Sequence, residues 1–255
     1  MIHALDHIGV AAASLARATA DYELLLGQRA RRSQPGSDAD RALFDLGNMR
    51  LVIHPASQGE AGLASLGFSV ADLGKARRLL EQRGLSTQDG DGDSARISSE
   101  GTHGVACTIL ERAPAAAPRT AVENTCEPDA AVSGLDHIVI RSPDPERAIA
   151  LYAGRLGLSL RLDRRAPEWG VRLLFFRCGD LIVEVAHDLK AGVGTGPDRL
   201  WGISWRVPDI DKAHARLRTG AVDVSGVRAG RRPHTRVFTV KSHSAGVPTL
   251  IIGPA

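Results

Sequence analysis

The tetrapeptide Leu-Asp-His-Ile occupies residues 5–8 and occurs again at residues 135–138, an offset of 130 positions in a chain of 255 residues. Tyr22 and Tyr152 keep the same offset, and so do two Leu-Gly pairs that begin four residues beyond these tyrosines. Three matches in one register are hard to obtain by chance, and an internal repeat of this kind decides the architecture. The chain is therefore predicted to be a duplication with one copy in each half.

Each half contains a shorter repeat of its own. Residues 66–73 (LGFSVADL) resemble residues 202–210 (GISWRVPDI), and each segment reads as a short apolar strand followed by the start of a helix. Each half also has a Gly-Val pair, at Gly104 and at Gly246, shortly before its last apolar run. The chain is therefore expected to contain four similar modules, two in each half.

The third module shows the order of elements most clearly. Residues 135–142 (LDHIVIRS) alternate in hydrophobicity like a strand. Asp144 is a favourable helix N-cap, Pro145 suits the first helical position, and Gly157 suits the end of the helix. Three strand-like runs separated by turn residues follow. The predicted fold class is therefore α+β, with four βαβββ modules that form two domains.

The segment 113–133 separates the two halves. It is rich in Ala and Pro and shows no hydrophobic periodicity, which is typical of a linker. We therefore expect an N-terminal domain at residues 1–112, a linker at 113–133 and a C-terminal domain at 134–255.

The composition excludes several classes of protein. A hydrophobic content of 43% and a charged content of 24% are those of a globular chain, which lacks any run of about 18 apolar residues that would predict a membrane span. Residues 1–20 lack the pattern of a secretory signal, and Cys107, Cys126 and Cys178 are too few for a disulfide framework. A cytoplasmic protein with reduced thiols is therefore expected. Aromatic residues make up only 4%, which argues against a nucleic-acid partner.

The second half contains all three tryptophans and most of the other aromatic residues. Small-molecule pockets are mostly apolar, and Tyr152, Trp169 and Phe176 are predicted to contact a substrate. Phe175 and Phe176 are neighbours on one predicted strand, so only one of them faces a pocket. Ordinary core packing is the alternative interpretation of these side chains.

Residues 228–236 carry four arginines and His234 in a loop with Gly and Pro. Arg236 begins a predicted strand and is therefore held better than the tip of the loop. Arginine binds carboxylates and phosphates with two parallel hydrogen bonds, so Arg236 is predicted to orient an acidic group of the substrate. A solvated basic loop is the alternative.

Four βαβββ modules, the two Leu-Asp-His-Ile openings and the Tyr…Leu-Gly helix ends together resemble a known family. This family is the glyoxalase/bleomycin resistance protein/extradiol dioxygenase group, the vicinal oxygen chelate (VOC) superfamily, and the resemblance covers residues 3–112 and 134–254. It implies that paired modules curl mixed sheets into a cup that binds a small molecule or a divalent metal. Because the superfamily includes many activities, the function has to be argued from the site.

The resemblance also implies where metal ligands would lie, on the first and last strands of paired modules. The corresponding positions on the first strands are His7, Ser65, His137 and Gly202, and those on the last strands are Val52 (with His54 two residues on), Thr108, Glu184 and Leu250.

His137 and Glu184 are the strongest candidates among these positions. Imidazole and carboxylate suit Fe, Mn, Ni, Zn or Co, and the same pair could act without metal as an acid and a base or be a relic of the duplication. His7 and His54 are weaker candidates for metal ligands in the N-terminal domain. Gly202 and Leu250 cannot ligate through their side chains, which departs from the two-His, one-carboxylate iron site of ring-cleaving dioxygenases.

The sequence thus predicts a VOC enzyme that acts on a small organic molecule. The expected chemistry is a metal-assisted lyase or isomerase reaction, in which His137 and Glu184 hold a divalent ion that stabilises an oxyanion and Arg236 orients the substrate. The alternatives are an extradiol-type ring-cleaving dioxygenase and a metal-free binding protein that sequesters drugs. Apolar sheet faces favour a homodimer, and no membrane partner is expected.

Overall fold

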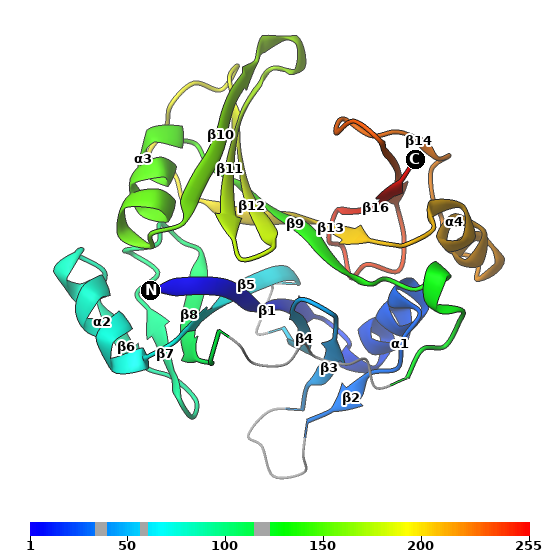
Figure 1. The fold of residues 1–255 in the computed structure, drawn as a ribbon, viewed down its shortest axis with the longest axis horizontal. Coiled ribbons are helices and arrows are strands. Elements are labelled where there is room, and N and C mark those ends of the chain that lie inside the picture. The colour runs from blue at the N-terminus through cyan, green and yellow to red at the C-terminus, as the bar shows by residue number, and fades with distance from the viewer. Residues whose placement is uncertain (34–39, 57–60, 115–122) are drawn as a thin grey trace. The chain divides into compact units, whose positions relative to one another are not determined.

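The N-terminal half forms one open sheet of eight strands in a computed structural model that describes residues 1–33, 40–56, 61–114 and 123–255 (Figure 1). The strand order is β2-β3-β4-β1-β5-β8-β7-β6. The strands are β1 (Ile2–Ala12), β2 (Arg31–Arg32), β3 (Ala42–Asp45), β4 (Arg50–Pro55), β5 (Gly62–Val70), β6 (Thr87–Asp89), β7 (Ser94–Ile97) and β8 (Ala106–Glu111).

The C-terminal half repeats this sheet with every strand number raised by eight. Its order is β10-β11-β12-β9-β13-β16-β15-β14. The strands are β9 (Gly134–Arg141), β10 (Ser159–Ala166), β11 (Val171–Cys178), β12 (Leu181–Asp188), β13 (Arg199–Arg206), β14 (Arg228–Ala229), β15 (Thr235–Val240) and β16 (Thr249–Pro254). Both sheets are mixed, because β12 pairs with β9 in parallel and with β11 antiparallel. The predicted α+β duplication is confirmed.

Each module contributes one main helix. These helices are α1 (Leu15–Leu26), α2 (Leu73–Gln82), α3 (Pro145–Ile149) with its π-helical continuation η2 (Ala150–Arg155), and α4 (Ile210–Thr219), and the short 3-10 turns are η1 (Pro128–Ala130) and η3 (Pro167–Trp169). The caps follow the sequence: the carboxylate of Asp144 accepts hydrogen bonds from the amides of Glu146 and Arg147, which satisfies two free donors of the first turn. Gly157 has a φ of +76° just after η2, a conformation that favours glycine.

The contacts within the chain divide it into two compact units that do not follow the two halves. The first unit contains residues 1–7, 65–117 and 137–201, and the second contains residues 8–64, 118–136 and 202–255. The second and third modules therefore belong to the first unit, and the first and fourth modules belong to the second.

Hydrogen bonds to the backbone join modules of different halves inside each unit. In the first unit, the amide of Asp198 donates to the carbonyl of His103 at 2.7 Å. In the second, Asn48 and Leu135 exchange two hydrogen bonds at 2.8 and 2.9 Å. None of the helices in the described ranges combines the length and the apolar character that a membrane crossing requires.

Candidate active site on strands β9 to β12

The register of strands β9 to β12 gives this part of the sheet two distinct faces. Glu184 on β12 pairs with Phe175 on β11 and with Val139 on β9, and paired residues of neighbouring strands share a face. His137 lies two residues before Val139, so it shares that face as well. We call this side the open face, because Phe175, His137 and Glu184 all retain solvent exposure on it.

The opposite face packs against α3 and η2 and is closed. It carries Ile138, Ile140, Leu174, Phe176, Val183 and Val185, which are all fully buried. Tyr152 of η2 is also fully buried, and its ring centroid lies 5.5 Å from that of Phe176. Burial raises the pKa of the Tyr152 phenol well above its usual range.

The structure therefore places Phe176 and Tyr152 in the core, away from His137 and Glu184. The predicted contact of these two side chains with a substrate does not agree with their position on the closed face. Phe175, the neighbour of Phe176, is the aromatic residue that shares the open face with Glu184. Side chains alternate along β11, so Phe175 and Phe176 lie on opposite faces of the sheet. Phe176 lies on the face that the helix covers.

His137 and Glu184, the strongest candidates from the sequence, lie next to each other. His137 Nε2 lies 3.7 Å from Glu184 Oε2, and the side chains are 20% and 15% exposed. A small molecule on the open face can therefore reach both groups. A carboxylate beside an imidazole can accept a proton and donate a hydrogen bond in the same site, which is the basis of general acid–base catalysis.

Trp169 belongs to η3, and its ring stacks on Arg164 with the guanidinium carbon 4.6 Å from the ring centroid. Arg164 pairs with Leu173 and therefore belongs to the open face. Trp169 thus lies beside this face and stays a candidate for substrate contact.

Arg236 does not lie free for a substrate. Its two terminal nitrogens donate to the carboxylate of Asp211 on α4 at 2.6 and 2.9 Å, and this hydrogen bonding lowers the pKa of Asp211. Phe238 is two residues further on the same strand, so it shares a face with Arg236, and it packs on His214 of α4. Arg236 therefore faces the helix side of β15, and the spacing of the sequence could not reveal this direction.

His7 and His54, the weaker candidates, have separate surroundings. His7 Nδ1 lies 3.0 Å from Asp6 Oδ2, and its ring covers Gly67 so closely that a Cβ at that glycine would collide with it. His54 is half-buried, and its Nδ1 lies 3.0 Å from the carbonyl of Pro55. Neither contact indicates a metal site.

The aspartates of the two Leu-Asp-His-Ile segments are structural, which the sequence analysis did not foresee. Asp6 is buried and lies 3.7 Å from Arg112 Nη1. Asp136 is buried and pairs with Arg206 at 3.1 Å and with Arg232 at 3.4 Å. The repeated motif thus supplies a buried ion pair in each copy.

The side chains around His137 and Glu184 offer few ligands for a catalytic metal. Within the residues that the structure describes, no group of three or more His, Cys, Asp or Glu side chains is close enough to hold an ion. Catalytic zinc sites take three protein ligands as a rule, and a non-haem iron site takes two histidines and one carboxylate. His137 and Glu184 alone fall short of either set, so the site does not fit an ion held by the protein in the usual way.

A model of a known protein family matches the part of the chain that carries this pair. The model of the glyoxalase/bleomycin resistance protein/dioxygenase superfamily matches residues 136–239. Residues 136–239 are therefore similar to this superfamily. The resemblance drawn from the sequence is thereby confirmed, and the match includes both His137 and Glu184.

Two curated relatives of this chain are epimerases. The human mitochondrial methylmalonyl-CoA epimerase is 31% identical over 88 residues, which are 32% of this chain and 50% of the relative. The ethylmalonyl-CoA/methylmalonyl-CoA epimerase of Cereibacter sphaeroides is 28% identical over 102 residues, which are 37% of this chain and 76% of the relative. The chain thus spans half the length of the human relative that it matches.

Solved structures share the fold over nearly the whole chain. The catechol dioxygenase BphC gives a TM-score of 0.71 at 17% identity and covers 99% of this chain and 87% of its own. The Mn(II)-bound glyoxalase from Novosphingobium aromaticivorans gives 0.73 at 14% identity, with 99% and 82% covered. At these identities the likeness shows the fold alone. The relatives and neighbours named here are enzymes.

Proposed function

We propose that this protein is an epimerase or isomerase that moves a proton at a carbon next to a carbonyl group. The observation that carries this proposal is the 3.7 Å approach of His137 Nε2 and Glu184 Oε2 on the open face. Two curated relatives of the chain are epimerases, which supports the same class of reaction.

Each residue of the pair has a distinct task. The Glu184 carboxylate accepts the proton from the carbon, and the electron pair of the broken C–H bond moves onto the carbonyl oxygen. The N–H of His137 donates a hydrogen bond to this oxygen while it carries negative charge. The planar enolate then turns its other face toward protonated Glu184, and return of the proton to that face completes an epimerisation. Return of the proton to the neighbouring oxygen or carbon completes an isomerisation.

Phe175 and Leu162 give the open face its apolar part. Phe175 is the cross-strand partner of both Glu184 and Leu162, and Leu162 is 50% exposed. Apolar surroundings strengthen the attraction between a hydrogen-bond donor and a developing oxyanion, because little water competes for it. A substrate with a compact apolar substituent fits this surface.

The first test is uptake of deuterium from heavy water. Methylmalonyl-CoA, ethylmalonyl-CoA and other 2-substituted acyl thioesters are incubated with the enzyme, and exchange at the carbon is followed by mass spectrometry. The proposal expects exchange with wild type and a loss of at least about 100-fold in Glu184→Gln, since general acid–base groups contribute about 10² to 10⁴ in rate.

Glu146→Gln is the matched control, because Glu146 is a carboxylate of the same module that pairs with Arg172 rather than with His137. It should exchange at the rate of wild type. Equal exchange rates in Glu184→Gln and wild type, or no exchange with any thioester of the panel, would refute the proposal.

Metal-assisted chemistry is the alternative form of this function, since one structural neighbour is a Mn(II)-bound glyoxalase. The donor set argues against it, and the same assay decides it. We expect chelator-treated wild type to keep its exchange activity. About one Fe, Mn, Ni, Zn or Co per chain that disappears in Glu184→Gln, together with loss of activity on chelation, would favour the metal instead.

Ring cleavage is a second candidate function, because the fold of BphC superimposes on the whole chain. The described residues lack a His-His-carboxylate group, and we therefore expect no oxygen uptake with catechols and ferrous iron. A drug-sequestering protein would instead bind a ligand tightly and release it unchanged.

A further inference from the structure

A second row of side chains crosses the open face beside the row that holds Glu184. Arg164 pairs with Leu173, Leu173 pairs with Ala186, and Ala186 pairs with Arg141, so these four residues form one line across β10, β11, β12 and β9. Each lies two residues along its strand from the row of Glu184. At about 3.3 Å per residue, the two rows are about 7 Å apart.

The arginines at the two ends of this row differ in their partners. Arg164 Nη2 lies 3.6 Å from the Glu168 carboxylate, which offsets part of its charge. Arg141 is exposed and has no carboxylate within ion-pair distance in the part of the chain that the structure describes. Arg141 therefore brings an uncompensated positive charge to the open face, on the strand that also carries His137.

Trp201 holds this charge in place. The guanidinium carbon of Arg141 lies 4.3 Å from the Trp201 ring centroid, and Trp201 is 40% exposed. Stacking on an aromatic face fixes the plane of the guanidinium and leaves its N–H groups at the edge available. Loss of side-chain entropy on binding an anion is thereby reduced, because the arginine is already ordered.

We propose that Arg141, oriented by Trp201, binds an oxyanionic group of the substrate, a carboxylate or a phosphate, on the same face of the sheet as Glu184 and one row of residues away. The substrate class is then an acidic carbonyl compound whose apolar substituent lies on Phe175 and Leu162. This assignment rests on the proposed function, because it takes the bound anion to be part of the substrate on which Glu184 acts. Anion binding by Arg141 itself can be measured without any turnover.

The test is a binding titration by calorimetry with two anions, methylmalonate and inorganic phosphate, and with the uncharged dimethyl ester of methylmalonate. The proteins are wild type, Arg141→Gln, Glu184→Gln and Arg165→Gln. Arg165 is the matched control, because it is an exposed arginine on β10 that pairs with Arg172 on the opposite face. Comparison of the two anions shows whether the group recognised is a carboxylate or a phosphate.

We expect wild type to bind at least one anion and not the ester, and Arg141→Gln to bind that anion at least about tenfold more weakly, since one charged hydrogen bond is worth that much. Arg165→Gln and Glu184→Gln should keep the wild-type affinity or exceed it. No binding to wild type, or equal binding to wild type and Arg141→Gln, would overturn the assignment.

The two proposals fail in different ways. Lost anion binding with deuterium exchange intact would overturn only the assignment of Arg141. Absent exchange with Arg141-dependent binding intact would overturn only the proton-transfer function. Where a substrate is turned over, Arg141→Gln should raise KM and leave kcat within about threefold, the pattern of a residue that binds substrate and transition state equally.

Discussion

Cys107 and Cys178 show how burial decides the chemistry of a single residue. Both thiols are buried, and burial raises the pKa of each to about 12. Cys126 is only half-buried. Because the thiolate is the reactive form, we expect iodoacetamide at about pH 8 to leave Cys107 and Cys178 of the folded protein unmodified, and to modify both after unfolding.

Peptide mapping by mass spectrometry measures this directly, with Cys126 as the internal comparison. Modification of Cys107 or Cys178 in the folded protein as fast as that of Cys126 would contradict the burial of β8 and β11.

The choice between Phe175 and Phe176 marks the limit of prediction at this scale. The segment 171–178 (VRLLFFRC) is apolar at adjacent positions, so the alternation identifies two faces without telling which one the helix covers. The family resemblance implied both His137 and Glu184 as candidates, and the structure places them 3.7 Å apart. Arg141 could not be predicted, since nothing in the sequence brings residue 141 to Trp201.

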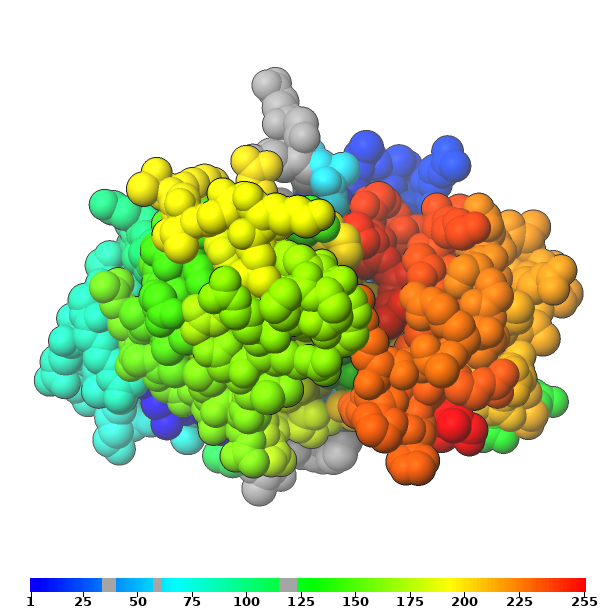
Figure 2. All heavy atoms as spheres, turned by 90° about the horizontal axis from the view of Figure 1, so that it is seen from above, coloured from blue at the N-terminus to red at the C-terminus, as the bar shows by residue number. Residues whose placement is uncertain are grey.

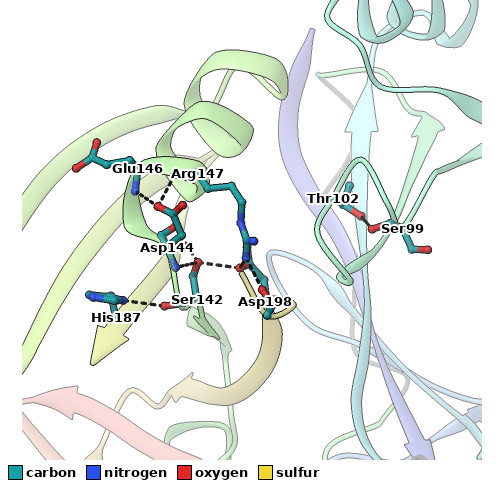
Figure 3. Close-up of polar contacts among 9 residues, drawn as sticks. Ser99, Thr102, Ser142, Asp144, Glu146, Arg147, His187 and Asp198 are labelled. Atoms are coloured by element: carbon teal, nitrogen blue, oxygen red, sulfur yellow. Dashed lines mark hydrogen bonds and ion pairs between the residues drawn. The ribbon is translucent and has the colours of Figure 1, made fainter. Parts of the chain in front are cut away.

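At the scale of elements, a buried polar network ties the surface loop between β12 and β13 to the start of α3 (Figure 3; the loop is yellow in Figure 2). Asp198 Oδ1 accepts hydrogen bonds from Ser142 Oγ and from Arg147 Nη2, each at 2.7 Å. The Asp198 side chain has no solvent exposure. The network therefore orders α3 against the end of β9, the strand that carries His137.

Asp198→Ala should be one of the most destabilising substitutions in the chain. It leaves the half-buried guanidinium of Arg147 without its ion-pair partner, and removal of one member of a buried pair costs about 3 to 5 kcal/mol. Ser142→Ala removes one hydrogen bond and should cost about 1 kcal/mol. Chemical denaturation measures both free energies of unfolding, and a cost below about 1 kcal/mol for Asp198→Ala would contradict the role given to the network.

The third helix shows what hydrophobic spacing leaves open. The pattern predicted one helix from Pro145 to Gly157, and the structure has an α-helix followed by a π-helical turn, in which the amide of Leu156 donates to the carbonyl of Leu151. A π-helical turn has hydrogen bonds between residues five apart, one more than in an α-helix. Apolar spacing therefore finds the helix but not its winding.

At the scale of the whole molecule, the repeat of the sequence predicted a duplication, and the structure has two sheets with the same strand order. The sequence left open which modules pair, and the contacts group the second module with the third and the first with the fourth. That grouping depends on particular pairs, such as Asn48 with Leu135, which no periodicity reveals.

The duplication also offers its own control, because the same Leu-Asp-His-Ile segment occurs in both halves. His137 approaches a glutamate on an open face, whereas His7 bonds to Asp6 and covers Gly67. Our account assigns proton transfer to the C-terminal copy and a structural role to the N-terminal one.

The most direct measurement is therefore deuterium exchange by His137→Gln and His7→Gln, side by side, with thermal melting to show that both variants are folded. Our account predicts a loss of about 100-fold in His137→Gln and a rate within about threefold of wild type in His7→Gln. Equal losses in the two folded variants, or a larger loss in His7→Gln, would contradict the assignment of the active site to the open face of β9 to β12.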